Sequence, residues 1–206
     1  MDFYKLPLFP LNLVVCPKGL INLRIFEARY LDMIKVCLRE KSGFGIVAAL
    51  PDIKTGITSH LPFASVGTLI DILDVEVSTV GLILISCRGS HRVKVNGFTI
   101  QPDGLVVGEV SDINNDLRNP IPDDLKIVSE NLQQLITSLP LQGILEKHIP
   151  ICKPYEYNDA AWVSNRWVEL LDLPLIQKQR LMQIDSPIVR LELIHDAINQ
   201  HTKKFS

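Results

Sequence analysis

The chain has 206 residues, of which 47% are hydrophobic and 21% charged, with a formal net charge of −2 at pH 7. This composition is ordinary for a soluble globular protein with a buried core, and it excludes an intrinsically disordered chain. Residues 1–113 carry 11 Lys/Arg against 11 Asp/Glu and residues 114–206 carry 10 against 12, so neither half has the basic surplus typical of a nucleic-acid-binding protein.

The chain also lacks the usual signals for secretion or membrane insertion. Its N-terminus has no charged segment followed by a continuous apolar stretch, and no run approaches the roughly eighteen apolar residues of a membrane span. The four cysteines, Cys16, Cys37, Cys87 and Cys152, are scattered and include no CxxC pair. We therefore expect reduced, buried thiols, a cytoplasmic protein and no contact with a membrane.

Short apolar or alternating runs separated by turn residues fill the N-terminal part of the chain. They predict about seven strands, over residues 11–16, 20–25, 44–50, 66–77, 82–87, 91–95 and 105–113. Glycine-containing turns are expected between them, including Arg88-Gly89-Ser90 and Asn96-Gly97. Many short strands with such turns are typical of a barrel or sandwich.

One helix is predicted within this β-rich part, over residues 27–39. Its apolar residues share one face, which we expect to lie across an open end or face of the sheet. The residues of that face are Tyr30, Leu31, Ile34, Cys37 and Leu38.

Near residue 115 the spacing of apolar residues changes to three and four, which predicts helices. The first begins at Pro122-Asp123-Asp124 and ends at Pro140, and Asn158 is expected to cap a second. A third covers residues 175–183, and Ser186-Pro187 begins the last. The sequence thus predicts a β-rich domain over residues 1–113 and a small α-helical bundle over residues 114–206.

The first fifty residues contain four motifs in a characteristic order. They are Leu6-Pro7-Leu8-Phe9-Pro10-Leu11, Pro17-Lys18-Gly19, Ile25-Phe26-Glu27-Ala28-Arg29-Tyr30-Leu31 and Phe44-Gly45-Ile46-Val47. In this order they resemble the opening of the Lon N-terminal (substrate-binding) domain family, especially its short stand-alone members. The resemblance continues through residues 64–68, 81–95 and 178–191, so it covers nearly the whole chain.

The resemblance implies an α+β fold: a PUA-like β-pseudobarrel with one inserted helix, followed by an α-helical subdomain. It further implies a role in protein quality control, since this region of family members contacts unfolded or tagged polypeptide and helps to assemble the protease. The expected partner is unfolded or extended polypeptide, together with a separate protease or chaperone. The residue patterns do not specify an oligomeric state.

Catalytic motifs are missing from the sequence. It contains no GxxxxGK[ST] loop for ATP, no GxSxG nucleophile elbow and no HExxH metal motif. We therefore expect no catalytic residue, no cofactor and no metal. A Cys–His nucleophile stays open, because its members meet only in the fold; Cys16 and Cys87 lie near predicted turns, and Arg88 could lower a thiol pKa.

Six residues are candidates for polypeptide binding: Phe26, Arg29, Tyr30, Arg88, Trp162 and Trp167. All of them except Arg88 have a structural alternative. Phe26 and Tyr30 could anchor the predicted helix in the core, while Glu27 and Arg29 tie its start to a neighbouring loop. The two tryptophans are five residues apart and so not on one helical stripe, which allows one to be an exposed interface anchor; the alternative is core or inter-domain packing.

Three functional hypotheses follow. The first is a non-enzymatic module that binds polypeptide at an edge strand or at an apolar seam. The second is RNA binding through the PUA-like barrel, with Arg24, Arg88, Arg92 and Lys94 gathered locally against the neutral overall charge. The third is a hydrolase site or a small-molecule site in a groove between the domains.

Overall fold

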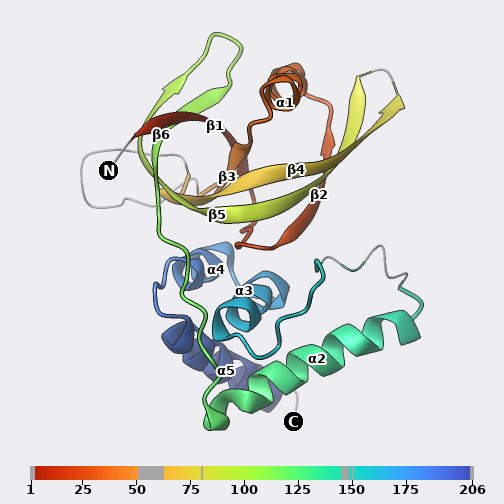
Figure 1. Ribbon diagram of the computed structural model, residues 1–206, viewed down its shortest axis with the longest axis vertical. Helices are drawn as coiled ribbons and strands as arrows, with labels where there is room; N and C mark the ends of the chain where they lie inside the picture. Colours follow the sequence, from red (N-terminus) through yellow and green to blue (C-terminus); the bar gives the residue numbers. More distant parts are fainter. Residues whose placement is uncertain (1–2, 51–62, 80, 145–148, 150, 205–206) are drawn as a thin grey trace. The chain divides into compact units, whose positions relative to one another are not determined.

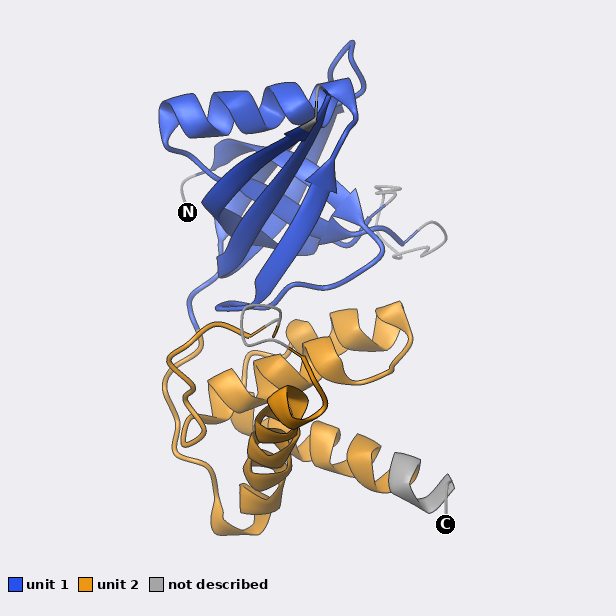
Figure 2. Cartoon of the chain, turned by 90° about the vertical axis from the view of Figure 1, so that its right-hand side faces the viewer, with its two compact units in different colours: residues 1–115 blue, residues 116–206 orange. Residues whose placement is uncertain are grey.

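The computed structural model describes residues 3–50, 63–79, 81–144, 149 and 151–204. The chain divides into two compact units, residues 1–115 and residues 116–206 (Figure 2). Within the described residues, all six strands and one α-helix belong to the first unit, and four α-helices belong to the second. The predicted α+β class is confirmed. Among these residues no helix is both long and apolar enough to cross a membrane.

The six strands of the first unit form one sheet with the order β2-β5-β4-β3-β1-β6, and a further pairing of β5 with β6 closes it into a barrel (Figure 1). The strand β2 pairs with β5 and lies outside this closure. The strands are β1 (Tyr4–Leu11), β2 (Leu20–Ile25), β3 (Phe44–Ala48), β4 (Val66–Thr79), β5 (Leu82–Ile100) and β6 (Val106–Asp112).

The helix α1 (Ala28–Glu40) lies across one end of the barrel, as its apolar face predicts (Figure 1). Tyr30 stacks on Phe9 of β1 with ring centroids 4.0 Å apart. Met33, Ile34 and Cys37 continue this contact into the main core of the unit. The helix ends where Lys41 takes a left-handed backbone conformation, with φ of 53°.

The predicted strand over residues 11–16 is wrong, because the strand β1 lies earlier, over Tyr4–Leu11. Two prolines lie within β1, although proline cannot donate a backbone hydrogen bond to a neighbouring strand. Each lies where only one neighbouring strand pairs with β1. Pro7 falls in the half that pairs with β6, and Pro10 in the half that pairs with β3. A missing proline N–H can face the unpaired side at such positions, so the ladder keeps its hydrogen bonds.

Two predicted turns are also wrong, because Gly89 and Gly97 lie inside β5, a single strand of 19 residues. A Cβ atom at Gly89 would lie 2.3 Å from the carbonyl oxygen of Cys16, so glycine there permits a close backbone approach rather than a turn. Gly97 follows a shift in the register of β5 against β6, which marks a β-bulge.

Over its described residues the second unit contains four α-helices and one turn of 3₁₀ helix. They are η1 (Asp123–Leu125), α2 (Lys126–Leu141), α3 (Ala160–Leu170), α4 (Leu175–Met182) and α5 (Pro187–Lys204). The cap of α3 is Asp159, whose carboxylate accepts a hydrogen bond from the N–H of Ala161, and not the predicted Asn158. Pro140 lies inside the last turn of α2 instead of ending it.

The core of the second unit includes a buried arginine. Arg190 of α5 has no exposed side-chain surface, and it donates hydrogen bonds to the carboxylate of Asp116 at 2.8 Å and to the side-chain oxygen of Asn165 at 2.5 Å. It also donates to the carbonyl oxygen of Ile184 at 2.6 Å. One side chain thus joins the start of the unit, α3 and the segment after α4 to α5.

Candidate functional site

The strand β2 is an edge of the sheet. Its residues pair in antiparallel register with β5, from Leu20 opposite Arg88 to Ile25 opposite Ile83. Among the residues that the structure describes, no other backbone segment pairs with its second side. An unpaired strand edge is a template on which another extended chain can add.

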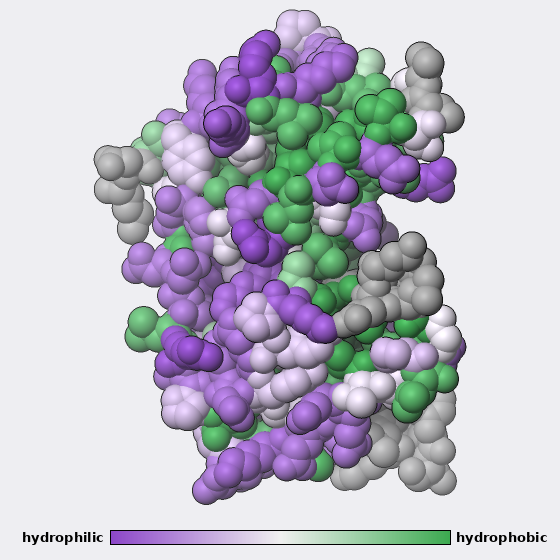
Figure 3. All heavy atoms as spheres, turned by 45° about the vertical axis from the view of Figure 1, so that its right-hand side comes forward, coloured by the Kyte–Doolittle hydropathy of each residue, from purple (hydrophilic) through white to green (hydrophobic). Residues whose placement is uncertain are grey.

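One face of β2 continues into rows of apolar side chains that cross β5 and reach β4. Leu23, Ile85 and Val75 form one row, and Ile25, Ile83 and Val77 form the next. Ile85 and Ile25 are buried, but Leu23, Val75 and Ile83 are partly exposed and Val77 is 73% exposed. Figure 3 turns this side of the first unit toward the viewer, and hydrophobic side chains form a broad area on it.

We call this region the β2 edge surface and define it by six apolar residues that are partly or largely exposed. They are Ile21, Leu23, Phe26, Val75, Val77 and Ile83. Phe26 follows the last residue of β2 and is 69% exposed, so the interpretation of Phe26 as a core anchor is wrong. Exposed apolar side chains beside an open strand edge favour binding of another polypeptide.

The opposite face of β2 is polar. Asn22 and Arg24 are exposed, and Arg24 lies opposite Leu84 of β5, with Glu76 of β4 beyond it. Within the described parts of the chain the Arg24 guanidinium has no hydrogen bond and no ion pair. The strand therefore offers apolar contacts on one face and an available cation on the other.

Arg29 and Tyr30 hold the start of α1 in place. The Arg29 guanidinium donates a hydrogen bond to the carbonyl oxygen of Gly104 at 3.0 Å, in the loop between β5 and β6, and forms an ion pair with Glu27 at 2.6 Å. This geometry confirms the expected tie between the helix start and a neighbouring loop. Tyr30 is only 6% exposed, and burial raises its pKa.

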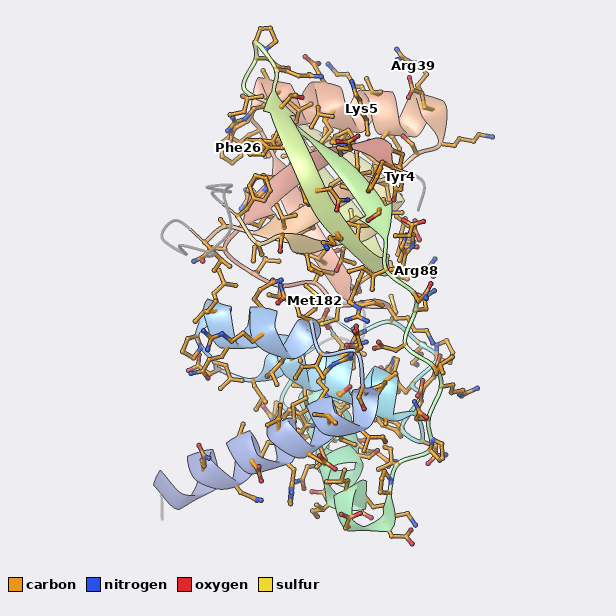
Figure 4. All side chains as sticks on the ribbon, turned by 90° about the vertical axis from the view of Figure 1, so that its left-hand side faces the viewer. Tyr4, Lys5, Phe26, Arg39, Arg88 and Met182 are labelled. Carbon is orange, nitrogen blue, oxygen red and sulfur yellow. The ribbon has the colours of Figure 1, made fainter. Side chains whose placement is uncertain are left out.

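The structure brings some of the predicted site residues together and separates others. Arg88 and Phe26 mark the two ends of β2 and lie well apart on the first unit (Figure 4). Trp162 and Trp167 belong to α3 in the second unit and are 3% and 8% exposed. The Trp167 indole N–H donates to the carbonyl oxygen of Val128 at 2.9 Å. Both tryptophans are core residues, as the packing alternative predicts.

The four basic residues weighed for RNA do not form one open surface. Arg92 is only 4% exposed, and Arg88 forms an ion pair with Asp71 at 3.6 Å. Arg24 lies opposite Leu84, at the other end of the β2–β5 pairing from Arg88. An RNA footprint needs cations clustered on one exposed face, which this arrangement does not favour.

The chemistry expected of a reactive cysteine is also not supported at Cys87. Its thiol is fully buried, and burial together with the nearby Asp71 raises its pKa to about 12. Arg88 cannot lower this pKa as expected, because neighbouring strand residues point to opposite faces and Arg88 is bound to Asp71. Among the residues described, no three His, Cys, Asp or Glu side chains gather as metal ligands would.

Comparison with known proteins agrees with this architecture. Residues 5–200 match the family model of the ATP-dependent protease La (LON) substrate-binding domain. The chain belongs to this family. Among Lon substrate-binding domains, a crystal structure of a Lon N-terminal domain protein from Xanthomonas campestris superposes with a TM-score of 0.73 and 32% sequence identity, covering 94% of this chain and 98% of that one.

Two further relatives share less of their sequence with this Lon-family chain. The N-terminal domain of a Mycobacterium avium complex Lon protease has a TM-score of 0.62 at 16% identity, covering 94% of this chain and 97% of that one, and supports the fold alone. A LON peptidase N-terminal domain and RING finger protein of Schizosaccharomyces pombe is 27% identical over 215 aligned residues. The match covers 92% of this chain but only 44% of that protein.

The sequence predicts an edge strand as a binding element but does not identify which strand it is. The alternation of apolar Ile21 and Leu23 with polar Asn22 and Arg24 was visible in the sequence. The exposure of Val77 was not, because it depends on where β4 extends beyond the barrel.

Proposed function

We propose that this Lon-family chain is a non-enzymatic module that binds unfolded or extended polypeptide, and that the β2 edge surface is its contact. Membership of the substrate-binding domain family supports a polypeptide ligand. The single observation that carries the assignment to this surface is the open edge of β2, flanked by partly exposed apolar side chains. A folded ligand protein buries its own apolar side chains, whereas an unfolded one exposes them for contact with this surface.

The proposal includes a role in cytoplasmic protein quality control beside a separate protease or chaperone. It is supported by the family and by the free thiols of Cys16, Cys37 and Cys87 in the core, since reduced cysteines are typical of proteins in a reducing compartment. The RNA and hydrolase alternatives have no comparable support, because Arg92 and Cys87 are buried.

The experiment is a binding titration with a reduced and alkylated, permanently unfolded protein as the probe, labelled for fluorescence anisotropy. The wild-type chain should bind the unfolded probe and leave its native form unbound. The double variant Phe26→Ser, Val77→Ser removes two largely exposed apolar side chains, so the fold should persist while affinity falls about tenfold.

A matched control removes two equally exposed apolar residues from the second unit, Leu117 and Leu141, which are 79% and 86% exposed. The variant Leu117→Ser, Leu141→Ser should bind the probe as the wild type does. Loss of binding in the control variant with retention in the Phe26/Val77 variant would contradict the assignment to the β2 edge surface. Absence of binding by the wild type would contradict the proposed function itself.

A further inference from the structure

We propose that β2 binds its polypeptide by strand addition: an extended segment lies along the open edge of β2, with apolar side chains on one face and an acidic side chain beside Arg24. This inference rests on the proposed function and specifies how the ligand is held. Its ligand class is an extended segment in which apolar residues alternate with acidic or neutral polar ones.

The backbone of β2 supplies the first part of the argument. In an antiparallel strand, alternate residues direct their N–H and C=O groups toward the partner strand, and the remaining ones direct them away. Since β5 occupies one side of Leu20–Ile25, the outward groups have no backbone partner among the described residues. Six residues span about 20 Å, so a segment of similar length can form a continuous ladder.

The side chains of β2 supply the second part. An added strand keeps the two-residue period of the sheet, so its alternate side chains meet the apolar face and the polar face of β2. Ile21 and Leu23 are partly exposed on the apolar face, and they extend the rows that reach Ile72 and Val75 on β4. Backbone pairing accepts many sequences, while this face selects for apolar residues at every second position.

Charge on the polar face supplies the third part. The Arg24 guanidinium has no ion pair within the part of the chain described here, whereas Arg88 at the other end of β2 is bound to Asp71. A carboxylate on the added strand next to Arg24 forms a favourable cross-strand pair, and a lysine there is repelled. The edge thus favours acidic over basic segments.

The same charge argues against a second copy of this chain as the occupant. Antiparallel pairing of two β2 strands that aligns all three apolar positions places Leu23 opposite Leu23 and Asn22 opposite Arg24. The two Arg24 side chains then lie on one face as diagonal neighbours, about 7–8 Å apart, with no carboxylate between them. A heterologous acidic segment avoids this repulsion.

The closing experiment uses an eight-residue peptide that alternates valine with glutamate, with blocked ends and a fluorescent label. Two N-methylated forms carry methyl groups on either the odd or the even amides. Strand addition needs the amides of one set only, so one form should lose affinity by more than about tenfold while the other stays within about twofold. If the peptide were held by its side chains alone, the two N-methylated forms would have equal affinities, and that result overturns the inference.

Arg24→Glu tests the charge preference. The wild type should bind the glutamate peptide at least about threefold more tightly than a lysine counterpart, and the variant should reverse this order. The control is Arg39→Glu, an exposed arginine in the last turn of α1, which should leave the order unchanged (Figure 4).

Failure of the inference is distinguishable from failure of the proposed function. If the unfolded probe binds but the two N-methylated peptides behave alike, the protein binds polypeptide by another mode and strand addition is wrong. If neither the probe nor the peptide binds, the proposed function is wrong. A wild-type dimer that the peptide dissociates, and that binds no unfolded probe, identifies a second copy as the occupant and also overturns the inference.

Discussion

The two units differ in the groups that they bury and in the groups that they expose. The main core cluster of the first unit consists of apolar residues, and it continues to an open strand edge where Leu23 and Val75 are partly exposed. The second unit buries charge, since Arg166 and Arg190 have no exposed side-chain surface. A buried ion pair fixes one arrangement of helices, while an open apolar edge accepts many extended partners. This difference agrees with the proposed binding role of the first unit and with a structural role for the Arg190 network of the second.

The largest effect is expected from removing the buried charge of the second unit. Arg190→Met should reduce the free energy of unfolding by about 3–5 kcal/mol, because it leaves the carboxylate of Asp116, which is 7% exposed, without its guanidinium partner. Chemical denaturation monitored by tryptophan fluorescence measures the loss, since Trp162 and Trp167 both belong to this unit.

The exposed Arg118 provides the control, and Arg118→Met should change the free energy of unfolding by less than about 0.5 kcal/mol. Adding Asp116→Leu to Arg190→Met should restore part of the lost stability, because the buried carboxylate that lost its guanidinium partner is then gone. A loss below about 1 kcal/mol in Arg190→Met alone is close to the error of extrapolating from denaturant, and it would contradict a structural role for this arginine.

A second change sharpens the account of the first unit. Gly89→Ala should destabilise the chain by about 2 kcal/mol, because the added Cβ would lie 2.3 Å from the carbonyl oxygen of Cys16 and the backbone must move. Gly97→Ala is the matched control within the same strand, since its Cβ would find its nearest neighbour, a Glu109 carboxylate oxygen, at 3.7 Å. Equal losses for the two variants in urea denaturation would argue against close approach as the reason for Gly89.

Gly89 also illustrates what the sequence could predict. Alternation gave the bounds of β2 correctly, and the spacing of apolar residues located α1 and the helices of the second unit. Local patterns did not distinguish a glycine that turns the chain from one that lets two backbone segments meet, because that difference depends on Cys16, far away in the sequence. The tolerance of the two prolines in β1 likewise depends on which neighbouring strands pair.

The candidate site was predictable only in part. Phe26 and Arg88 were singled out from the sequence, but Arg24 was considered only as a cation for RNA. Its availability follows from the absence of an ion pair to it within the described residues, which is a property of the assembled sheet. Burial of Trp162 and Trp167 likewise depends on packing within the second unit, not on their spacing.

The smallest predicted effect concerns a polar cluster at the end of β6. The Asp112 carboxylate accepts hydrogen bonds from the Tyr4 hydroxyl at 2.7 Å and contacts the His91 imidazole at 2.9 Å, and these bonds lower the pKa of Asp112 below its ordinary value of 3.8. A lowered carboxyl pKa contributes stability that is present above the ordinary value and is lost as the pH falls through the lowered one.

The test is thermal denaturation between about pH 2 and pH 6, a range that includes the ordinary carboxyl pKa. Below about pH 4 the stability of the wild type should decrease more steeply than that of Asp112→Asn. The difference should be small, because the Asp112 side chain is 60% exposed and water screens its interactions. Asp74→Asn, at an exposed aspartate of β4, is the control for a general acid effect. If Asp112→Asn keeps the full wild-type slope, the Tyr4–Asp112–His91 cluster does not stabilise the barrel, and the apolar core with its ladder alone accounts for the stability of the first unit.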